Sequence, residues 1–100
     1  MAMTPERKKV KQKVTKQLKS LGAYFTTPAT WGYGKSGVSD FLGCYCGKFF
    51  AFECKANGGK LTPLQEFNLQ QVREADGLGM EINEGNVEHV TEILLKLGNK

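Results

Sequence analysis

The segment around Gly47 contains three residues whose types and spacing could perform chemistry: Asp40, Glu53 and Lys55. If the chain turns here and returns as an antiparallel hairpin, paired positions have numbers that sum to about 93 to 95, so Asp40 lies opposite residues 53–55. Glu53 and Lys55 are two positions apart and share one face of their strand, whereas Cys54 points to the other face, toward the core. We therefore expect two carboxylates and one ammonium group to meet at one end of the hairpin.

Two neighbouring carboxylates repel each other, and a proton, another cation or a metal ion relieves the repulsion. Carboxylate oxygens with open water positions suit Mg²⁺ or Mn²⁺, and such an ion can bind a phosphate oxygen and activate water for in-line attack. Lys55 would then orient the water, lower its pKa or stabilise developing negative charge. In the alternative interpretation, Asp40 only begins a strand while Glu53 and Lys55 form an ordinary exposed pair, which is the usual meaning of an isolated E-x-K.

The charged residues are distributed unevenly along the chain. Residues 1–50 contain nine lysines and arginines and two acids, whereas residues 51–100 contain five basic residues and eight acids. This asymmetry favours a polyanionic partner such as nucleic acid, although a solvated helix face has the same composition. In the glycine-rich stretch 28–37, Trp31 or Tyr33 could stack on an unpaired base, and burial of the tryptophan is the alternative. The candidate nucleic-acid contacts are Lys8, Lys9, Lys35, Ser36 and Lys60.

The elements that must position these residues follow from hydrophobic periodicity and capping signals. A helix is expected over 4–21, because Thr4 can cap it and Gly22 can end it. Its apolar residues follow one stripe and are Val10, Val14, Leu18 and Leu21. A second helix begins at the capping box Thr62-Pro63-Leu64-Gln65 and runs to about Asp76. Strands are expected over 23–27, 39–46, 48–55 and 78–83, and a last helix over 87–97. The order α-β-β-β-α-β-α predicts an α/β fold, in which helices pack on a mixed sheet.

The length of 100 residues fits one domain, residues 1–100, with one modest core. No apolar run is long enough to predict a membrane span, and the polar, basic start of the chain lacks the pattern of a secretory signal. Cys44, Cys46 and Cys54 are too few for a disulfide framework and fit the reducing cytoplasm. A C-x-C could contribute thiols to a zinc site, but a fourth ligand is lacking, so we interpret the three cysteines as small buried hydrophobes.

The order of these motifs resembles the PD-(D/E)xK nuclease superfamily, and in particular its small stand-alone VRR-NUC domains, which phages often encode. The resemblance rests on Ser36-Gly37-Val38-Ser39-Asp40, on Phe52-Glu53-Cys54-Lys55-Ala56 and on the more specific Gly59-Lys60-Leu61-Thr62-Pro63-Leu64-Gln65. It implies a restriction-endonuclease-like core and metal-dependent hydrolysis of phosphodiester bonds, in the bacterial host cytoplasm if a phage encodes the chain. Ser39 stands where the family usually has proline, which would only pre-set an extended backbone.

The resemblance also implies a role for each residue of the hairpin end. Asp40 and Glu53 would be ligands for Mg²⁺ or Mn²⁺. The backbone carbonyl of Cys54 would be a third ligand, and Lys55 would be the catalytic lysine.

Two further residues match the family, one on the first expected helix and one on the second. Gln65 matches a glutamine at the start of the helix that follows the E-x-K motif, and its alternative role is the capping box with Thr62. Glu6 matches an acidic residue on the first helix that can join the metal site. Its alternative role is a favourable negative charge at a helix N-terminus.

Together these features predict a Mg²⁺- or Mn²⁺-dependent DNA endonuclease. A chain of this size has no appended domain for reading bases, so we expect a structured substrate, such as a four-way Holliday junction or another branched DNA. Cutting two strands of a junction needs two active sites, which a homodimer would supply. The alternatives are a basic module that binds nucleic acid without cleaving it, or a nuclease for nicked DNA, flap DNA or RNA.

Overall fold

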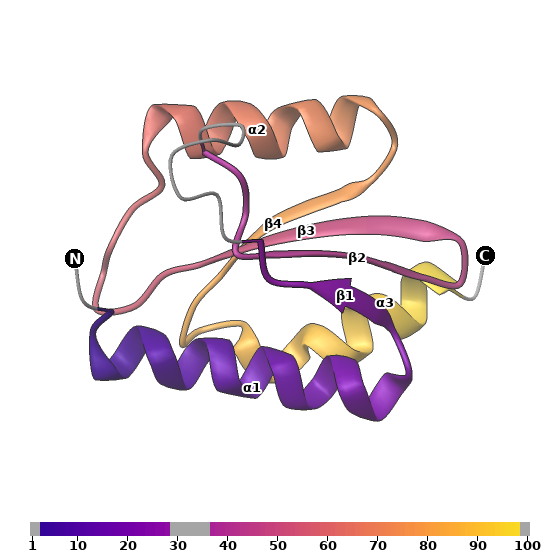
Figure 1. Ribbon diagram of the computed structural model, residues 1–100, viewed down its shortest axis with the longest axis horizontal. Coiled ribbons are helices and arrows are strands. Elements are labelled where there is room, and N and C mark those ends of the chain that lie inside the picture. The colour runs from indigo at the N-terminus through magenta and orange to yellow at the C-terminus, as the bar shows by residue number, and fades with distance from the viewer. Residues whose placement is uncertain (1–2, 29–36, 99–100) are drawn as a thin grey trace.

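The computed structural model describes residues 3–28 and 37–98. In chain order its elements are α1 (Pro5–Leu21), β1 (Tyr24–Thr26), β2 (Phe41–Tyr45), β3 (Lys48–Cys54), α2 (Pro63–Glu74), β4 (Leu78–Ile82), the 3₁₀ turn η1 (Val87–His89) and α3 (Val90–Gly98). The predicted α/β class and element order are confirmed (Figure 1). Trp31, Tyr33, Lys35 and Ser36 lie outside the described residues, so the contacts expected of them stay predictions.

The four strands form one mixed sheet in the order β1-β2-β3-β4. The first three strands are antiparallel, and β4 runs parallel to β3. A parallel pair requires a crossover connection, which α2 supplies. The sheet separates two helical layers, with α2 on one face and α1 and α3 on the other (Figure 1). Strand β3 therefore lies between the layers, and its last five residues are buried.

The hairpin formed by β2 and β3 has a register within the range that the sequence predicts. Tyr45 pairs with Lys48 and Phe41 pairs with Phe52. The two residues of the turn, Cys46 and Gly47, have φ values of 51° and 81°, which are typical of a type I′ turn. Because paired numbers in this register sum to the same value, the position that follows Phe41↔Phe52 brings residue 40 opposite residue 53.

Two of the three cysteines do not have the environment that we expected. Cys54 is buried, but Cys44 and Cys46 are exposed. Cys44 lies on the opposite face of β2 from the buried Phe41, and Cys46 has left the strand for the turn. The interpretation of these two as small buried hydrophobes is therefore wrong, because Cys44 belongs to the face of β2 that lies away from the core and the turn removes Cys46 from the strand.

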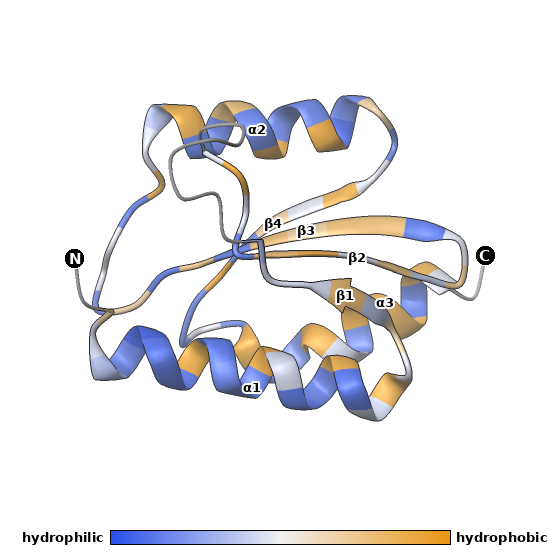
Figure 2. Cartoon of the chain, in the orientation of Figure 1, coloured by the Kyte–Doolittle hydropathy of each residue, from blue (hydrophilic) through white to orange (hydrophobic). Residues whose placement is uncertain are grey.

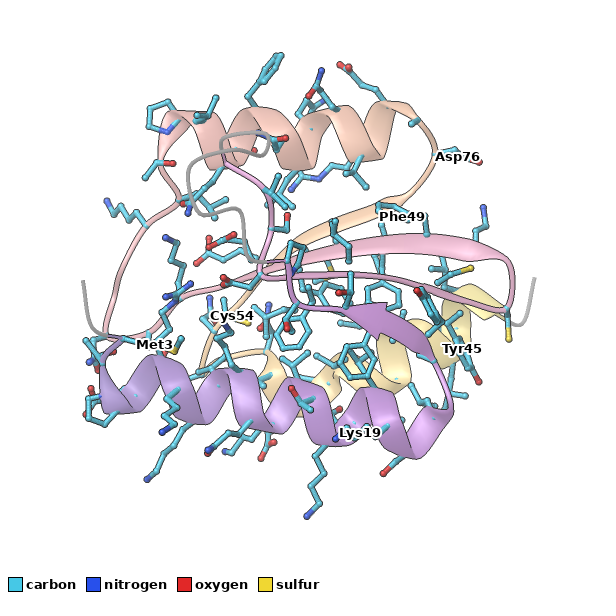
Figure 3. The ribbon with its side chains drawn as sticks, in the orientation of Figure 1. Met3, Lys19, Tyr45, Phe49, Cys54 and Asp76 are labelled. Atoms are coloured by element: carbon cyan, nitrogen blue, oxygen red, sulfur yellow. The ribbon has the colours of Figure 1, made fainter. Side chains whose placement is uncertain are left out.

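The hydrophobic core lies between the sheet and the layer of α1 and α3. It consists of Val10, Val14, Leu18, Phe41, Phe50, Phe52, Cys54, Ile82, Val87, Val90 and Leu94. Figure 2 shows that β3 is hydrophobic over most of its length, whereas α1 is largely hydrophilic with apolar bands. In Figure 3 the Cys54 side chain lies on the side of the sheet that faces α1, and Phe49 lies on the side that faces α2. This alternation directs Glu53, next to Cys54, away from the α1–α3 core.

Most elements match the predicted ranges to within one or two residues, and two of the differences have an evident structural cause. The strand expected over 39–46 begins only at Phe41, because Asp40 lies in a bend where its side chain accepts the backbone N–H of Cys54. The helix expected over 87–97 begins with η1, in which the His89 N–H donates to the Asn86 carbonyl. Such 3₁₀ turns are common at helix starts. Within residues 3–28 and 37–98, every helix falls short of the length and apolar character that a bilayer crossing demands.

Candidate active site

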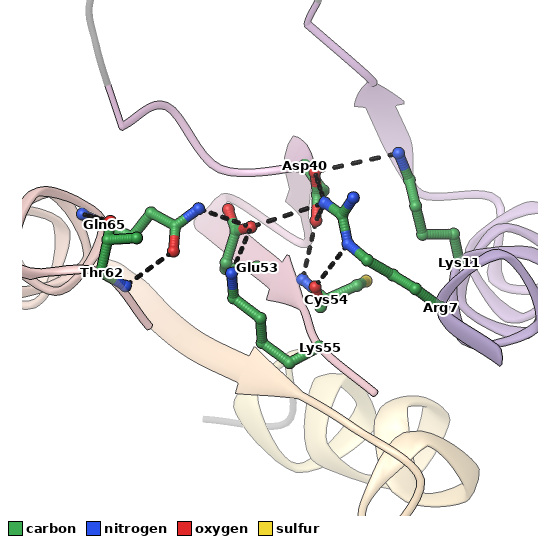
Figure 4. A network of polar contacts seen from close by, with 8 residues as sticks. All are labelled: Arg7, Lys11, Asp40, Glu53, Cys54, Lys55, Thr62 and Gln65. Carbon is green, nitrogen blue, oxygen red and sulfur yellow. Dashed lines mark hydrogen bonds and ion pairs between the residues drawn. The ribbon is translucent and has the colours of Figure 1, made fainter. Parts of the chain in front are cut away.

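Four of the residues proposed from the sequence meet at the open end of the β2–β3 hairpin (Figure 4): Asp40, Glu53, Lys55 and Gln65. Asp40 immediately precedes β2, and Glu53 lies one residue before the end of β3. Lys55 follows β3, and Gln65 comes from the first turn of α2. The structure thus brings together side chains from one hairpin and from the helix that follows it.

The carboxylate of Asp40 is held on both of its oxygens. Its Oδ2 accepts the Cys54 backbone N–H at 2.9 Å. Arg7 Nη2 donates to Oδ1 and Oδ2, both at 2.8 Å, and Lys11 Nζ lies 3.8 Å from Oδ1. Because the side chain of Asp40 is only 15% exposed, these contacts orient a carboxylate that is largely shielded from water.

Glu53 is a buried acid whose Oε2 contacts neighbouring side chains and whose Oε1 has no partner among the described residues. Its side chain is 2% exposed, and Oε2 lies 3.7 Å from Arg7 Nη2 and 3.9 Å from Lys55 Nζ. Oε1 is buried and has no hydrogen-bond partner among the residues that the structure describes. Burial raises the pKa of Glu53 to about 7, reinforced by the negative charge of Asp40 and by a hydrogen bond between the two acid side chains, and opposed by Lys55 and Arg7. A cation beside Oε1 would satisfy this oxygen and favour the ionised form.

Gln65 joins the start of α2 to the buried acid. Its Oε1 accepts the Thr62 N–H at 2.9 Å, and its own N–H donates to Thr62 Oγ1 at 3.2 Å, which is the capping box expected from the sequence. Its Nε2 donates to Glu53 Oε2 at 3.1 Å. Gln65 can therefore cap the helix and contact Glu53 at the same time, so the two roles proposed for it are geometrically compatible.

Lys55 is positioned by the sheet. Its backbone N–H donates to the Ile82 carbonyl at 2.9 Å, which continues the pairing between β3 and β4 beyond Cys54. The side chain is 16% exposed, and its ammonium group lies beside Glu53 Oε2. A cation held next to a carboxylate at this position can stabilise negative charge on a phosphate or orient a water molecule.

Sequence reasoning missed two basic residues of the site, Arg7 and Lys11. From the sequence both count only among the basic residues of the first half of the chain, yet both contact Asp40. Arg7 also donates from Nε to the Cys54 carbonyl at 3.0 Å. A signal was present, because Arg7 lies seven and eleven positions before the buried Val14 and Leu18 and so shares their face of α1.

Glu6, the other candidate ligand on α1, contacts a different part of the chain. Its Oε1 accepts from Asn57 Nδ2 at 3.0 Å, and it lies in the first turn of α1, where a negative charge is favourable. On α1, both Arg7, the next residue, and Lys11 contact Asp40, and Arg7 also lies near Glu53.

Lysines that were expected to contact nucleic acid are exposed but lie in different surroundings. Lys8, Lys9 and Lys60 are all exposed. An open groove of about 440 Å³ along α1 is lined by Met3, Lys8, Lys11, Gln12, Thr15, Lys16 and Lys19. Lys9 instead lines a smaller hollow with Glu6 and Glu84. The first groove is basic and reaches Asp40 through Lys11, whereas two acids offset the charge of the second.

The oxygens at this site fit a divalent metal ion. Two carboxylates and one backbone carbonyl, those of Asp40, Glu53 and Cys54, are grouped around the Arg7 guanidinium, and hard oxygen donors are what Mg²⁺ and Mn²⁺ prefer. The buried Oε1 of Glu53, unpaired within residues 3–28 and 37–98, points to the same conclusion. Among the residues that the structure describes, no three His, Cys, Asp or Glu side chains are grouped to hold a metal. An ion here would therefore complete its coordination with the carbonyl, water or substrate.

Comparison with known proteins identifies the fold of the chain. No protein-family model matches the chain, and no curated protein matches its sequence. A solved structure described as a VRR_NUC domain is similar to it with a TM-score of 0.74 and 18% sequence identity, over 89% of this chain and 97% of that chain. The expectation of a VRR-NUC-like, restriction-endonuclease-type fold is confirmed, and we conclude that this chain has the fold of a VRR-NUC domain.

Proposed function

We propose that this protein is a metal-dependent endonuclease that hydrolyses phosphodiester bonds in DNA, with Mg²⁺ or Mn²⁺ as its ion. One observation carries the proposal: two carboxylates, one of them buried with an unpaired oxygen, meet a backbone carbonyl and Lys55 at the rim of the sheet. The VRR-NUC-like fold supports it. Among the described residues Oε1 of Glu53 has no hydrogen-bond partner, and a bound cation would supply one, since buried polar atoms normally have partners.

Each residue of the site has a role in this proposal. Asp40, Glu53 and the Cys54 carbonyl would hold the ion, which when bound supplies Lewis-acid polarisation of the scissile phosphate and acidifies water. The Lys55 ammonium stabilises negative charge that develops on the phosphate. Gln65 fixes Oε2 of Glu53 in place through its 3.1 Å hydrogen bond.

DNA is the substrate that the charge distribution favours. The basic groove along α1 leads to Asp40 through Lys11, so a phosphate backbone lying in it would pass the site. Lysine contacts bind backbone charge without reading base sequence. We therefore propose that DNA shape, as in four-way or otherwise branched DNA, sets the preference. We also propose a homodimer, since two cuts in one junction need two sites.

The experiment that tests the function is a cleavage assay on end-labelled DNA. Linear duplex, single strand, nicked duplex, flap and four-way junction are each incubated with Mg²⁺, Mn²⁺ or EDTA. We expect metal-dependent cleavage, reduced on the order of 10²-fold or more in Asp40→Asn and Lys55→Ala. Asp76→Asn is the matched control, because Asp76 is 95% exposed and has a φ of 71°, which asparagine tolerates.

The alternative function is a basic module that binds nucleic acid without cleaving it. For such a module, Asp40→Asn would strengthen DNA binding by removing a negative charge near the lysines, and divalent ions would have little effect. Bound but uncut DNA in both metals would therefore overturn the proposed enzyme. Equal cleavage of all five substrates would keep the nuclease and remove the preference for branched DNA.

A further inference from the structure

The guanidinium of Arg7 contacts all three groups that would hold the ion (Figure 4). Nη2 donates to both carboxylate oxygens of Asp40 at 2.8 Å and lies 3.7 Å from Glu53 Oε2. Nε donates to the Cys54 carbonyl at 3.0 Å. One cationic group thus bridges two carboxylates and a carbonyl. Together with Lys11 and Lys55, it offsets the negative charge of the site.

This position is unfavourable for a cation within its own helix. Arg7 lies in the first turn of α1, where its backbone N–H donates to the capping Thr4 Oγ1 at 3.2 Å. The positive end of the helix dipole disfavours a basic side chain there. The carboxylates across the site offset that cost. The Arg7 side chain is 30% exposed, so it can move toward solvent without unfolding of the helix.

Arg7 and a divalent ion would compete for the same lone pairs. Oδ2 of Asp40 already accepts from both Arg7 and the Cys54 N–H, which are the two bonds that its lone pairs most readily accept. An ion on these oxygens would lie a few ångströms from the guanidinium charge, and like charges repel strongly in partly buried surroundings. Within the described residues Oε1 of Glu53 carries no such contact, so Arg7 does not occupy its lone pairs.

We propose that Arg7 is an exchangeable counter-cation of this site: its guanidinium holds Asp40 and the Cys54 carbonyl while no metal is bound, and it releases them when Mg²⁺ or Mn²⁺ binds. The inference rests on the proposed metal site and deepens it. A guanidinium suits this role better than an ammonium group, because its planar fork can bond the carboxylate and the carbonyl at the same time. Arg7 therefore lowers the affinity for the ion and keeps the two carboxylates from repelling each other in its absence.

The first test uses side-chain NMR signals of the intact protein without DNA. Arg7 and Arg73 are the two arginines of the sequence, so two Nε–Hε signals are expected, and Arg7→Lys assigns them. Arg73 Nε donates to the Gly79 carbonyl at 2.9 Å and serves as an internal reference. During Mg²⁺ titration at constant ionic strength, the Arg7 signal should shift or broaden together with the backbone amide of Cys54, while the Arg73 signal stays in place.

The second test measures metal affinity in variants, by electron paramagnetic resonance of free Mn²⁺. We expect Arg7→Ala to bind Mn²⁺ about tenfold more tightly, because the ion no longer displaces a charge-assisted pair. Its melting temperature should be lower than that of the wild type without metal and should rise more when metal is added. Lys8→Ala removes the same charge from an exposed neighbour, so it controls for a general loss of positive charge. Arg7→Lys should fall between Arg7→Ala and the wild type.

Three outcomes overturn the exchange, and they are distinguishable. An unmoved Arg7 signal beside a shifted Cys54 amide means that the ion binds next to the arginine, and the metal site itself stands. Weaker Mn²⁺ binding by Arg7→Ala, with Lys8→Ala unchanged, means that Arg7 prepares the site instead of competing for it. If neither signal responds to the ion, the proposed metal site is wrong, and the exchange is wrong with it. If Arg7→Ala does not fold, the wild-type titration and Arg7→Lys still decide the question.

Discussion

Gln65 and Glu53 are joined by a hydrogen bond of 3.1 Å that makes the first turn of α2 part of the site. Both polar atoms of the Gln65 side-chain amide form hydrogen bonds: Nε2 donates to Glu53, and Oε1 accepts the backbone N–H of Thr62. The position of the buried acid therefore depends on how the helix begins. Folding of α2 and orientation of Glu53 are coupled through one side chain.

Gln65→Glu should separate these two roles. A glutamate at this position retains the capping box, but its negative charge repels Glu53 and raises the pKa of that acid further above its ordinary value. We expect the rising limb of the pH–rate profile for DNA cleavage to move to higher pH.

Thr62→Ala is the matched control for Gln65→Glu. It removes the cap and should lower the free energy of unfolding by about 1 kcal/mol, while leaving the bond between Gln65 and Glu53 available. Its pH–rate profile should match that of the wild type. If Gln65→Glu also retains the wild-type profile, Gln65 serves only to cap the helix.

The stability of the protein in EDTA should fall as the pH rises from about 4.5 to about 7. Burial and the charge of Asp40 raise the pKa of Glu53 from 4.5 to about 7, so in this range the folded state binds more protons than the unfolded state and loses stability with rising pH. The loss is on the order of 1–3 kcal/mol and levels off above the folded-state pKa. Urea unfolding at several pH values measures it. In Glu53→Gln the slope should largely disappear, and a slope unchanged in that variant would assign it to other groups.

Gly37→Ala should cost more stability than Gly58→Ala. The two glycines have φ values of 76° and 73°, so alanine is strained at both. Within the described residues a Cβ at Gly58 meets no atom within 4 Å, but a Cβ at Gly37 would lie 2.8 Å from Asn68 Nδ2 and 2.9 Å from the Leu64 carbonyl. We expect losses of about 1 kcal/mol for Gly58→Ala and about 2–4 kcal/mol for Gly37→Ala by urea unfolding. Equal losses would show that the segment before Asp40 relaxes away from α2.

Lys8→Ala should weaken DNA binding more than Lys9→Ala. Lys8 lines the basic groove along α1, whereas Lys9 lies with Glu6 and Glu84 in a hollow where their charges offset its own. Binding in EDTA, measured by fluorescence anisotropy at several salt concentrations, should show a slope reduced by about one for Lys8→Ala. The slope for Lys9→Ala should change less. The opposite order would place the DNA on the other side of α1.

The hairpin end of the site could be predicted from the sequence because local geometry determines it. A turn at Cys46 and Gly47 sets one register, and the register alone brings Asp40 and Glu53 together. The side-chain period of two then separates Glu53 from Cys54. The start of α2 was equally accessible, because a capping box is a pattern within four consecutive residues.

The contribution of α1 could not be predicted in the same way, because it depends on how a helix docks against a distant strand. Continuing the buried stripe toward the N-terminus from Val10 leads to Glu6 at a spacing of four and to Arg7 at a spacing of three, and both spacings fit a helix. Packing decides between them and directs Arg7 to Asp40. The environment of Cys46 was misjudged for a related reason, since the turn gives it a φ of 51° and removes it from the strand.

The register of the β2–β3 hairpin makes the site sensitive to the parity of chain length in these strands. A single residue inserted into β3 before Glu53 would turn its carboxylate into the α1–α3 core and bring the Cys54 thiol to the site. Two inserted residues, matched by two in β2, would restore both faces and only lengthen the hairpin. Insertions and deletions compatible with this site are therefore even-numbered and occur in both strands of the hairpin. This rule restricts how the sequences of distant relatives can be aligned across β2 and β3.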